Sequence, residues 1–173
     1  NRRSAETFLA RTWAHAQKRD LSLALVAIDV DHFKRYNDHH GHQAGDHCLQ
    51  AVARALSACS RRAGDLVARL GGEEFVLIMG DAEPGVALSV AQRIQASVQD
   101  LALPHGGSPE ARVVTVSVGV ASMRPGADEA DAVLMKRADA ALYAAKGSGR
   151  NRVCEMDADG RIRCLSPLDG GRA

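Results

Sequence analysis

The feature that most constrains this chain is a short apolar run, LSLALVAIDV, at Leu21–Val30. The run is rich in β-branched residues and far shorter than the roughly 20 residues of a membrane span, so it predicts a buried strand. A buried strand requires helices packed over its sheet. Acidic residues, Asp29 and Asp31, stand where this strand ends. We therefore expect a layered fold with carboxylates at one end of its central strand.

Further strands are predicted by the same pattern. Arg112–Ser122 is the clearest of them, and Asp65–Leu70 and Phe75–Met79 flank the sequence Gly-Gly-Glu-Glu, which predicts a hairpin with acidic residues at its tip. A second hairpin is expected from Arg152–Met156 and Arg161–Leu165, which flank the turn sequence Asp-Ala-Asp-Gly.

Helical periodicity predicts the elements between these strands. The expected helices are Ser4–Asp20 (with Ser4 as N-cap), Phe33–His40, Asp46–Ser60, Pro84–Leu103 and Asp128–Lys146, with Gly41–Asp46 as a loop. This order of elements predicts an α/β (α+β) fold. We expect a mixed central sheet of about five strands flanked by helices, close to the ferredoxin-like palm of nucleotidyl cyclase catalytic domains.

Length and composition narrow the functional classes. The 173 residues predict one domain, which we place at residues 1–156, followed by a C-terminal hairpin strand and tail at 157–173. Lys plus Arg number 22 and Asp plus Glu 21, so the formal net charge is +1, which argues against a binder of nucleic-acid polymers. The composition also excludes disordered and disulfide-scaffold chains.

The four cysteines form no CxxC pair and indicate a reducing, cytoplasmic setting. Cys48 and Cys59 are predicted to pack as small apolar side chains. Cys154 and Cys164 face each other across the predicted terminal hairpin, where a disulfide can form, although a reducing setting argues against it. The cluster of histidines at 39–47 matches no closed zinc site.

Carboxylates at two strand ends suggest a metal site. Asp29, Glu73 and Glu74 would come together if their strands were neighbours in the sheet, and such a cluster needs a hard cation to neutralise it. Mg²⁺ serving phosphoryl chemistry fits this pattern. The alternative is two unrelated acidic turns.

Several cationic and polar residues have two interpretations. Lys34, Lys146 and Arg150 could hold phosphates, or could be ordinary cations such as helix C-termini favour. Asn37 and Asp46 could read a guanine edge, or could be turn-formers and caps. No Walker A or GxGxxG motif is present in the sequence.

In combination, these motifs resemble a known family. Gly71–Phe75 (GGEEF) is similar to the signature of the GGDEF family, the bacterial diguanylate cyclases. The other matching motifs follow in family order: Asp29–Lys34, Asn37–Asp38, Gly41–Asp46, Ser117–Ala121, Ala138–Lys146 and Gly149–Asn151. Asn1–Arg3 resembles the end of the family's opening motif. We therefore expect an upstream sensory domain outside this sequence.

The resemblance implies an activity and its site residues. The family condenses two GTP molecules into cyclic di-GMP and two pyrophosphates, using Mg²⁺ or Mn²⁺. The implied catalytic residues are Glu73, as base, and Asp29, with metal ligation by Asp29, the Val30 carbonyl, Glu73 and Glu74. Guanine would be read by Asn37 and Asp46, where a carboxylate fits GTP. Phosphates would be held by Lys34, Lys146 and Arg150 and by main-chain N–H groups near His32 and Phe33.

The resemblance also implies regulation and pairing. Arg62 and Asp65 match the family's RxxD site for product inhibition by cyclic di-GMP, and Arg93 matches a secondary arginine of that site; from the residues alone, Arg62 and Asp65 would be a surface ion pair. Each domain holds one GTP, so two domains must face each other as a homodimer. A cytoplasmic domain is implied, whether or not its parent protein is membrane-anchored.

The alternatives belong to other functional classes. A catalytically weak receptor for cyclic di-GMP would keep the RxxD residues and turn GTP over poorly. A dimerisation module would retain only the fold. A different nucleotidyl-cyclase palm would share the metal chemistry without the full set of motifs.

Overall fold

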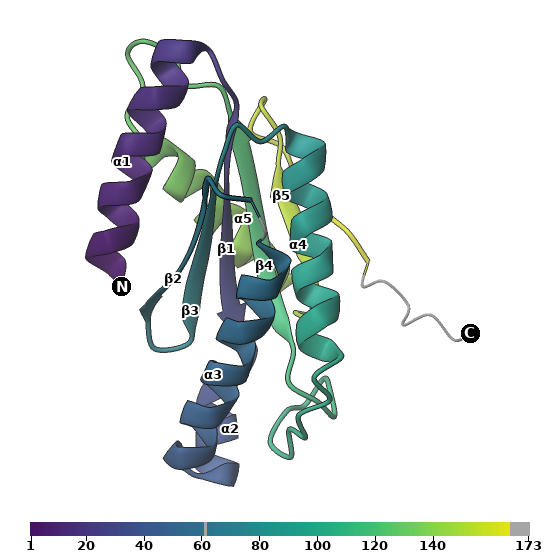
Figure 1. Cartoon of the computed structure of the whole chain (residues 1–173). Helices are drawn as coiled ribbons and strands as arrows, with labels where there is room; N and C mark the ends of the chain where they lie inside the picture. The colour runs from purple at the N-terminus through teal and green to yellow at the C-terminus, as the bar shows by residue number, and fades with distance from the viewer. Residues whose placement is uncertain (61, 167–173) are drawn as a thin grey trace.

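The computed structural model describes residues 1–60 and 62–166, and its central feature is a six-stranded sheet in the order β2-β3-β1-β4-β5-β6 (Figure 1). The strands are β1 (Leu23–Val30), β2 (Asp65–Gly71), β3 (Glu74–Gly80), β4 (Val116–Met123), β5 (Val153–Met156) and β6 (Ile162–Cys164). The mixed sheet expected from the sequence is confirmed, with β6 as a short additional edge strand. Most of the predicted tail, residues 167–173, lies outside the described residues.

The predicted buried strand forms the middle of this sheet. All eight residues of β1 are buried, and β1 pairs antiparallel with both β3 and β4. Its alternate side chains enter different cores: Ala24, Val26 and Ile28 face one side, and Leu23 and Leu25 face the other. The continuous apolar run therefore arises because both faces of the sheet are covered.

Two layers of helices cover the sheet. The helices are α1 (Arg2–Arg19), α2 (Phe33–His40), α3 (His42–Cys59), α4 (Pro84–Gln99) and α5 (Ala132–Gly147). α1 and α5 pack on one face, and α3 and α4 pack on the other with α2 below them (Figure 1). α2 and the start of α3 extend past the end of the sheet at which β1 terminates.

Several predicted boundaries are corrected. α1 begins at Arg2, because the Asn1 side chain caps it by accepting a hydrogen bond from the Ser4 N–H at 3.0 Å. α3 begins at His42, so the expected loop 41–46 is helical. The reversal between α2 and α3 takes place at Gly41 alone, whose φ of 87° suits glycine.

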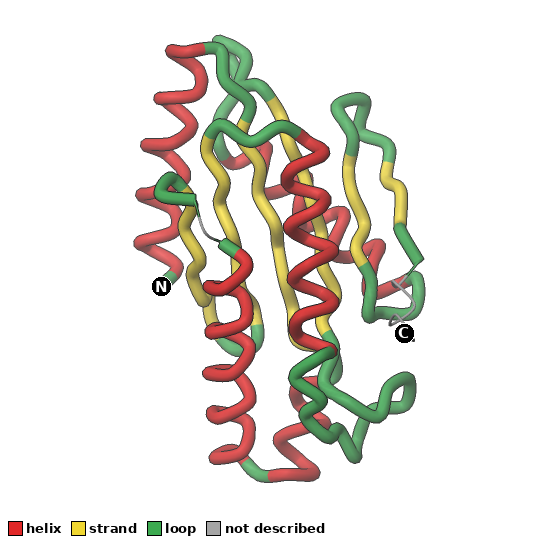
Figure 2. Tube along the Cα trace, turned by 45° about the vertical axis from the view of Figure 1, so that its right-hand side comes forward, coloured by secondary structure: helices red, strands yellow, loops and turns green. Residues whose placement is uncertain are grey.

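The C-terminal hairpin forms one edge of the sheet (Figure 2). β5 runs parallel to β4, and β6 returns antiparallel beside β5 with Cys154 directly opposite Cys164. These two residues form a disulfide, contrary to the expectation drawn from a reducing setting, because the strand register places their side chains together. Cys48 and Cys59 are free and buried, as predicted. Within residues 1–60 and 62–166, no helix has the length and hydropathy of a membrane span.

Candidate functional site

The end of β1 and the tip of the β2–β3 hairpin lie side by side. Asp29 is paired with Glu74 in the strand register, and the Val30 N–H donates to the Glu73 carbonyl at 3.3 Å. The hairpin can reverse here because Gly72, with φ of 51°, adopts a left-handed conformation. Asp29 and the two glutamates of the hairpin tip, which the sequence separates by more than forty positions, therefore lie at one edge of the sheet.

Asp29 is the most enclosed of these carboxylates, with 7% of the residue exposed. Burial raises its pKa, and the negative charges of Glu73 and Asp31 raise it further. Lys146 opposes this effect, since its Nζ lies 2.7 Å from Asp29 Oδ2. The Asp29 carboxylate thus sits beside like charges and is stabilised by one cation from α5.

Asp31 has a different role from its neighbour. Its buried carboxylate accepts hydrogen bonds from the Thr115 and Ser117 hydroxyls at 2.7 and 2.6 Å and from the Asn151 main-chain N–H at 3.0 Å. It therefore fixes the turn after α5, which contains Arg150, to the strand β4. The alternating Thr115 and Ser117 were a signal in the sequence that could have indicated this role.

Glu74 is more exposed and faces the start of α1. Its Oε2 lies 3.6 Å from Arg2 Nη2, with both side chains more than half exposed. Asp139 on α5 shares this corner, where burial raises its pKa, Glu74 adds to the rise and Arg2 opposes it. Asp139 and Arg2 are charged neighbours of the site that the sequence did not identify as such.

The donor set has the chemistry of a magnesium site without a closed cage of ligands. Asp29 and Glu73, with the Val30 carbonyl beside them, supply the oxygen donors that Mg²⁺ prefers. In the described part of the chain, no group of three or more His, Cys, Asp or Glu side chains is placed to hold one ion. A site of this type fits Mg²⁺, which commonly uses one or two carboxylates and completes its shell with water and phosphate oxygens.

Two of the three cationic residues predicted to hold phosphates lie at this edge of the sheet. Lys146 belongs to the last turn of α5 and binds Asp29, while Arg150 follows in a left-handed conformation with φ of 59°. The Arg150 guanidinium lies 3.6 Å from the carboxylate of Glu110, a residue that the sequence did not suggest. Lys34 is exposed on α2.

The chain enters α2 directly from the acidic edge. His32 is the N-cap residue, with φ of 53°, and Phe33 is buried as the first residue of the helix. Main-chain N–H groups at a helix start attract anions, because they have no partner within the helix and stand at the positive end of its dipole. His32 and Phe33 are therefore placed to contact a phosphate.

The two predicted guanine readers come from adjacent helices. Asn37 Oδ1 is buried without a hydrogen-bond partner, and it lies so close to Gly45 that a Cβ there would be 1.8 Å from it. Asp46, the next residue of α3, is exposed and lines a hollow of about 310 Å³ between α3 and β2. An unpartnered buried amide oxygen beside an exposed carboxylate is suited to reading the donor groups of a base.

The RxxD residues lie at the opposite end of the β2–β3 hairpin from Glu73. Arg62 donates to the Asp81 carbonyl at 2.8 Å, and Arg93 donates to the Cys59 carbonyl at 2.8 Å. Asp65 Oδ1 is buried without a partner, and burial raises the Asp65 pKa although Arg62 opposes the rise. From the residues alone, Arg61 and Arg62 were expected to form an exposed ion pair with Asp65; Arg62 is bound to Asp81 instead, and Arg61 lies outside the described residues.

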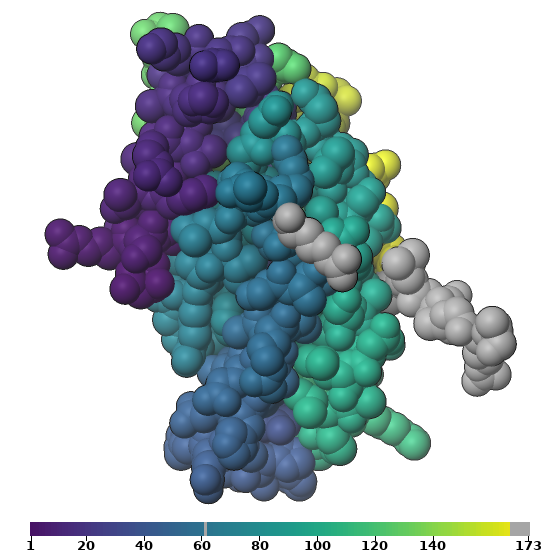
Figure 3. Space-filling view, in the orientation of Figure 1, coloured from purple at the N-terminus to yellow at the C-terminus, as the bar shows by residue number. Residues whose placement is uncertain are grey.

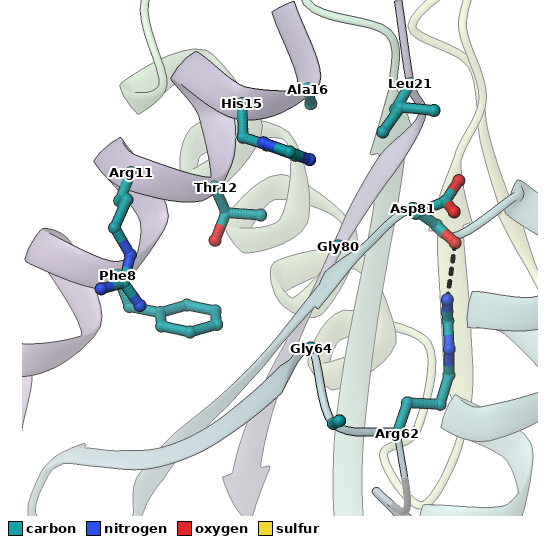
Figure 4. Close-up of a pocket in the computed structure, with 11 residues that line it drawn as sticks. Phe8, Arg11, Thr12, His15, Ala16, Leu21, Arg62, Gly64, Gly80 and Asp81 are labelled. Atoms are coloured by element: carbon teal, nitrogen blue, oxygen red, sulfur yellow. Dashed lines mark hydrogen bonds between the residues drawn. The ribbon is translucent and has the colours of Figure 1, made fainter. Parts of the chain in front are cut away.

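A hollow of about 470 Å³ adjoins this end of the hairpin (Figure 4). Figure 4 shows α1 on one side of it and Arg62 on the other, with the Arg62 guanidinium bound to Asp81. Arg11 and His15 of α1 contribute further nitrogen-bearing side chains to the lining. This end of the sheet is therefore separate from the acidic edge and carries its own cationic surface.

Comparison with known proteins matches this arrangement to a family. The family model "Diguanylate cyclase, GGDEF domain" matches residues 1–152. Among curated relatives, diguanylate cyclase A of Treponema denticola is 41% identical over 132 residues, which cover 76% of this chain and 34% of that protein. Diguanylate cyclase DgcM of Escherichia coli K12 is 48% identical over 130 residues, covering 75% and 30%. The chain thus spans about a third of the length of these relatives.

Solved structures show the same fold. The GGDEF domain of DgcB from Caulobacter crescentus, in complex with c-di-GMP, superposes with a TM-score of 0.80 at 36% identity and covers 90% of each chain. The active GGEEF domain of a diguanylate cyclase from Vibrio cholerae gives a TM-score of 0.77 at 31% identity, covering 90% of this chain and 96% of that one.

Proposed function

Since this chain belongs to the GGDEF domain family of diguanylate cyclases, we propose that it condenses two GTP molecules into cyclic di-GMP and two pyrophosphates. The observation that carries this proposal is the meeting of Asp29 with Glu73 and Glu74 at one sheet edge, with Lys146 bound to Asp29 and Arg150 on the adjacent turn. An edge that combines carboxylates with cations is suited to transferring a nucleotidyl group.

Each residue group has a chemical role in this reaction. Glu73 accepts the proton of the attacking 3′-hydroxyl, and it is half-buried beside the end of β1. Lys146, Arg150 and Lys34, with the N–H groups of His32 and Phe33, orient the phosphates and balance the charge on the leaving pyrophosphate. This reaction requires in-line positioning more than covalent chemistry by the protein.

The carboxylates of this edge fit a divalent cation. Asp29 and Glu73, with the Val30 carbonyl, would hold Mg²⁺, or Mn²⁺ in its place. Glu74, which faces Arg2 in this structure, would have to turn toward the ion to serve as the further ligand. Such an ion would neutralise phosphate charge and polarise the reacting phosphoryl group. Asn37 and Asp46 select guanine, the buried amide oxygen and the exposed carboxylate both accepting from N–H groups of the base.

The product requires two copies of the domain. Cyclic di-GMP is a symmetric dimer of nucleotides, and each domain supplies one set of guanine and phosphate groups. Two domains must therefore face each other in an antiparallel pair, each presenting a 3′-hydroxyl to the α-phosphate held by the other. The rate per domain of this chain should then rise steeply with protein concentration.

The RxxD end provides product inhibition in this proposal. Arg62 and Asp65 bind cyclic di-GMP through charge-assisted hydrogen bonds, assisted by Arg93. The unpartnered Asp65 Oδ1 supports a site of this kind, because a buried acceptor is stabilised when a ligand donates to it. The same observation supports the second candidate function, a catalytically weak domain that acts as a cyclic di-GMP receptor.

Product analysis separates these functions. The chain is incubated at high concentration with GTP and Mg²⁺, and nucleotides are resolved by chromatography for the wild type and for Glu73→Gln. Cyclic di-GMP from the wild type, with a loss of about 100-fold or more in the variant, is expected for the cyclase. Tight cyclic di-GMP binding without turnover by either protein, even at high concentration, would favour the receptor. A rate per domain that stays constant on dilution would contradict catalysis by a pair.

A further inference from the structure

The loop 103–114, between α4 and β4, is packed closely against α2. A Cβ at Gly106 would lie 2.3 Å from the His39 ring, and one at Gly107 would lie 2.9 Å from the Arg35 carbonyl. The Gly106 N–H also donates to His40 Nε2 at 3.3 Å. Figure 3 shows this loop (green) beside α2 and the start of α3 (blue) at the lower end of the molecule. The two glycines allow the loop to approach the helix.

The loop is also held by its own contacts. His105 is 3% exposed and its ring stands edge-on to the Tyr36 ring of α2, with centroids 5.3 Å apart. Pro104 and Val113 form an isolated β-bridge, and the His105 N–H donates to the Arg112 carbonyl at 2.9 Å. A loop braced in this way gives its side chains defined positions.

Glu110 reaches from this loop to Arg150, a cation of the proposed phosphate site, and to the ring of His32, whose main-chain N–H belongs to that site. Its Oε2 is hydrogen-bonded to His32 Nε2. Its Oε1 lies 3.6 Å from Nη1 of Arg150, which is partly exposed. The next residue, Ala111, is held by a hydrogen bond from its N–H to the Ser108 hydroxyl at 3.2 Å.

The position of Glu110 is one that suits a phosphate oxygen. A carboxylate that is hydrogen-bonded to the His32 ring and lies beside a guanidinium is stabilised by charge-assisted bonding, the same effect that holds a phosphate. A phosphate that engaged Arg150 with Glu110 still bound would bring two anions together. The carboxylate and a phosphate therefore compete for these donors.

We propose that Glu110 is an internal anionic competitor, whose carboxylate a nucleotide phosphate displaces from Arg150. This inference rests on the proposed function, because it takes Arg150 and the start of α2 to bind the triphosphate. Glu110 thus lowers the affinity for every phosphate that binds Arg150, by the free energy needed to displace its carboxylate.

Removal of the charge on Glu110 tests the inference. Glu110→Gln keeps the length and hydrogen-bonding capacity of the side chain and removes its charge, so it should bind guanosine 5′-(α,β-methylene)triphosphate with Mg²⁺ about 5- to 10-fold more tightly than the wild type. The same variant should bind GMP measurably more tightly. The matched control is Glu83→Gln, which removes the charge from another carboxylate–arginine pair, with Arg124 at 3.1 Å.

The measurements are equilibrium titrations of each protein with the methylene analogue and with GMP, accompanied by steady-state KM for GTP. Tighter binding and a lower KM in Glu110→Gln, with Glu83→Gln equal to the wild type, would support competition. Equal or weaker binding by a folded Glu110→Gln, with Glu110→Ala behaving alike, would overturn it. In that case a wild type that binds the analogue and makes cyclic di-GMP would leave the proposed function standing, whereas a wild type that does neither would overturn both.

Discussion

At the tip of the β2–β3 hairpin, charged side chains are bound to one another, whereas at its base they are bound to main-chain carbonyls. Near the tip, Lys146 binds Asp29 at 2.7 Å and Arg2 faces Glu74 at 3.6 Å. At the base, Arg62 and Arg93 donate to carbonyl groups at 2.8 Å. The tip of the hairpin therefore lies among oppositely charged pairs, whereas its base lies beside arginines that donate to neutral carbonyl groups.

This difference indicates which kind of ligand each end of the hairpin could bind. At the tip, an anionic ligand that binds Lys146 or Arg2 leaves the carboxylate partner of that cation without a counter-ion. A divalent cation would have to neutralise this carboxylate, so a triphosphate and the metal ion would have to bind together. At the base, an anion replaces neutral carbonyl acceptors with a bond between two opposite charges, which is the stronger of the two. The proposed binding of a phosphodiester at the base would therefore need no metal.

The largest effect is expected from breaking the pair at the tip. Lys146→Met leaves the buried Asp29 carboxylate without its cation and removes a phosphate contact, so kcat/KM for GTP should fall by about 100-fold or more. The measurement is the initial rate of cyclic di-GMP formation over a range of GTP concentrations. Lys136→Met, at an exposed position of α5, is the matched control and should retain the wild-type rate. Equal rates in both variants would show that Lys146 does not contribute to catalysis.

At the base, Arg62→Ala should weaken cyclic di-GMP binding by about tenfold or more, since it removes a charge-assisted contact. The assay is the cyclic di-GMP concentration that half-inhibits the initial rate, supported by direct titration. Arg54→Ala, an exposed arginine of α3, serves as the control. An unchanged half-inhibition concentration would mean that the base of the hairpin is not the inhibitory site. The two ends of the hairpin would then not divide catalysis from inhibition.

A smaller effect is expected at the helical pair α2–α3, where the proposed guanine readers lie. Gly45→Ala would place a Cβ 1.8 Å from Asn37 Oδ1, so the amide must move, and KM for GTP should rise by about 5- to 10-fold with a loss of preference over ATP. Gly85→Ala, in the first turn of α4 with open space around it, is the control. Comparable KM values in the two variants would show that Asn37 does not contribute to guanine selection.

The smallest effect concerns the pH dependence of stability at the base. Burial raises the pKa of Asp65, so the folded state holds this proton more tightly than the unfolded state, and stability falls as pH rises from the unfolded pKa through the folded one. Asp65→Asn should therefore raise the melting temperature at pH 7, by no more than about 2 °C because water partly screens the carboxylate, and the gain should vanish toward pH 3. Thermal melts across this range would contradict the assignment if the gain were independent of pH.

The sequence predicted those parts of the molecule whose signals are local. The apolar run of β1 and the Gly-Gly-Glu-Glu turn specified a buried strand and a hairpin, and the structure places them side by side as expected. The start of α3 was missed because His42 to Asp46 is polar and carries a glycine, yet the turn at Gly41 is complete in one residue. Helix propensity alone does not locate such a boundary.

Contacts between distant segments were beyond prediction from one sequence. Asp31 was grouped with Asp29 as an acidic pair, but its partners come from β4 and from the turn after α5. Glu110 lies in a loop with no motif, and its role depends on how that loop packs on α2. The Cys154–Cys164 disulfide follows from the register of β5 and β6, which places the two side chains together. The expectation of reduced cysteines, drawn from a reducing compartment, did not take this register into account.

The helical pair α2–α3 extends past the end of the sheet and carries both proposed guanine readers, whereas the carboxylates proposed to serve the chemistry belong to β1 and the hairpin tip. A substitution at Asn37 or Asp46 therefore leaves the strand register and the acidic edge unchanged. The two tasks can diverge independently over evolutionary time. A lineage can acquire a different purine preference through a few changes in one helical pair while inheriting its phosphoryl-transfer apparatus intact, and a protein engineer can vary the same positions without rebuilding the core.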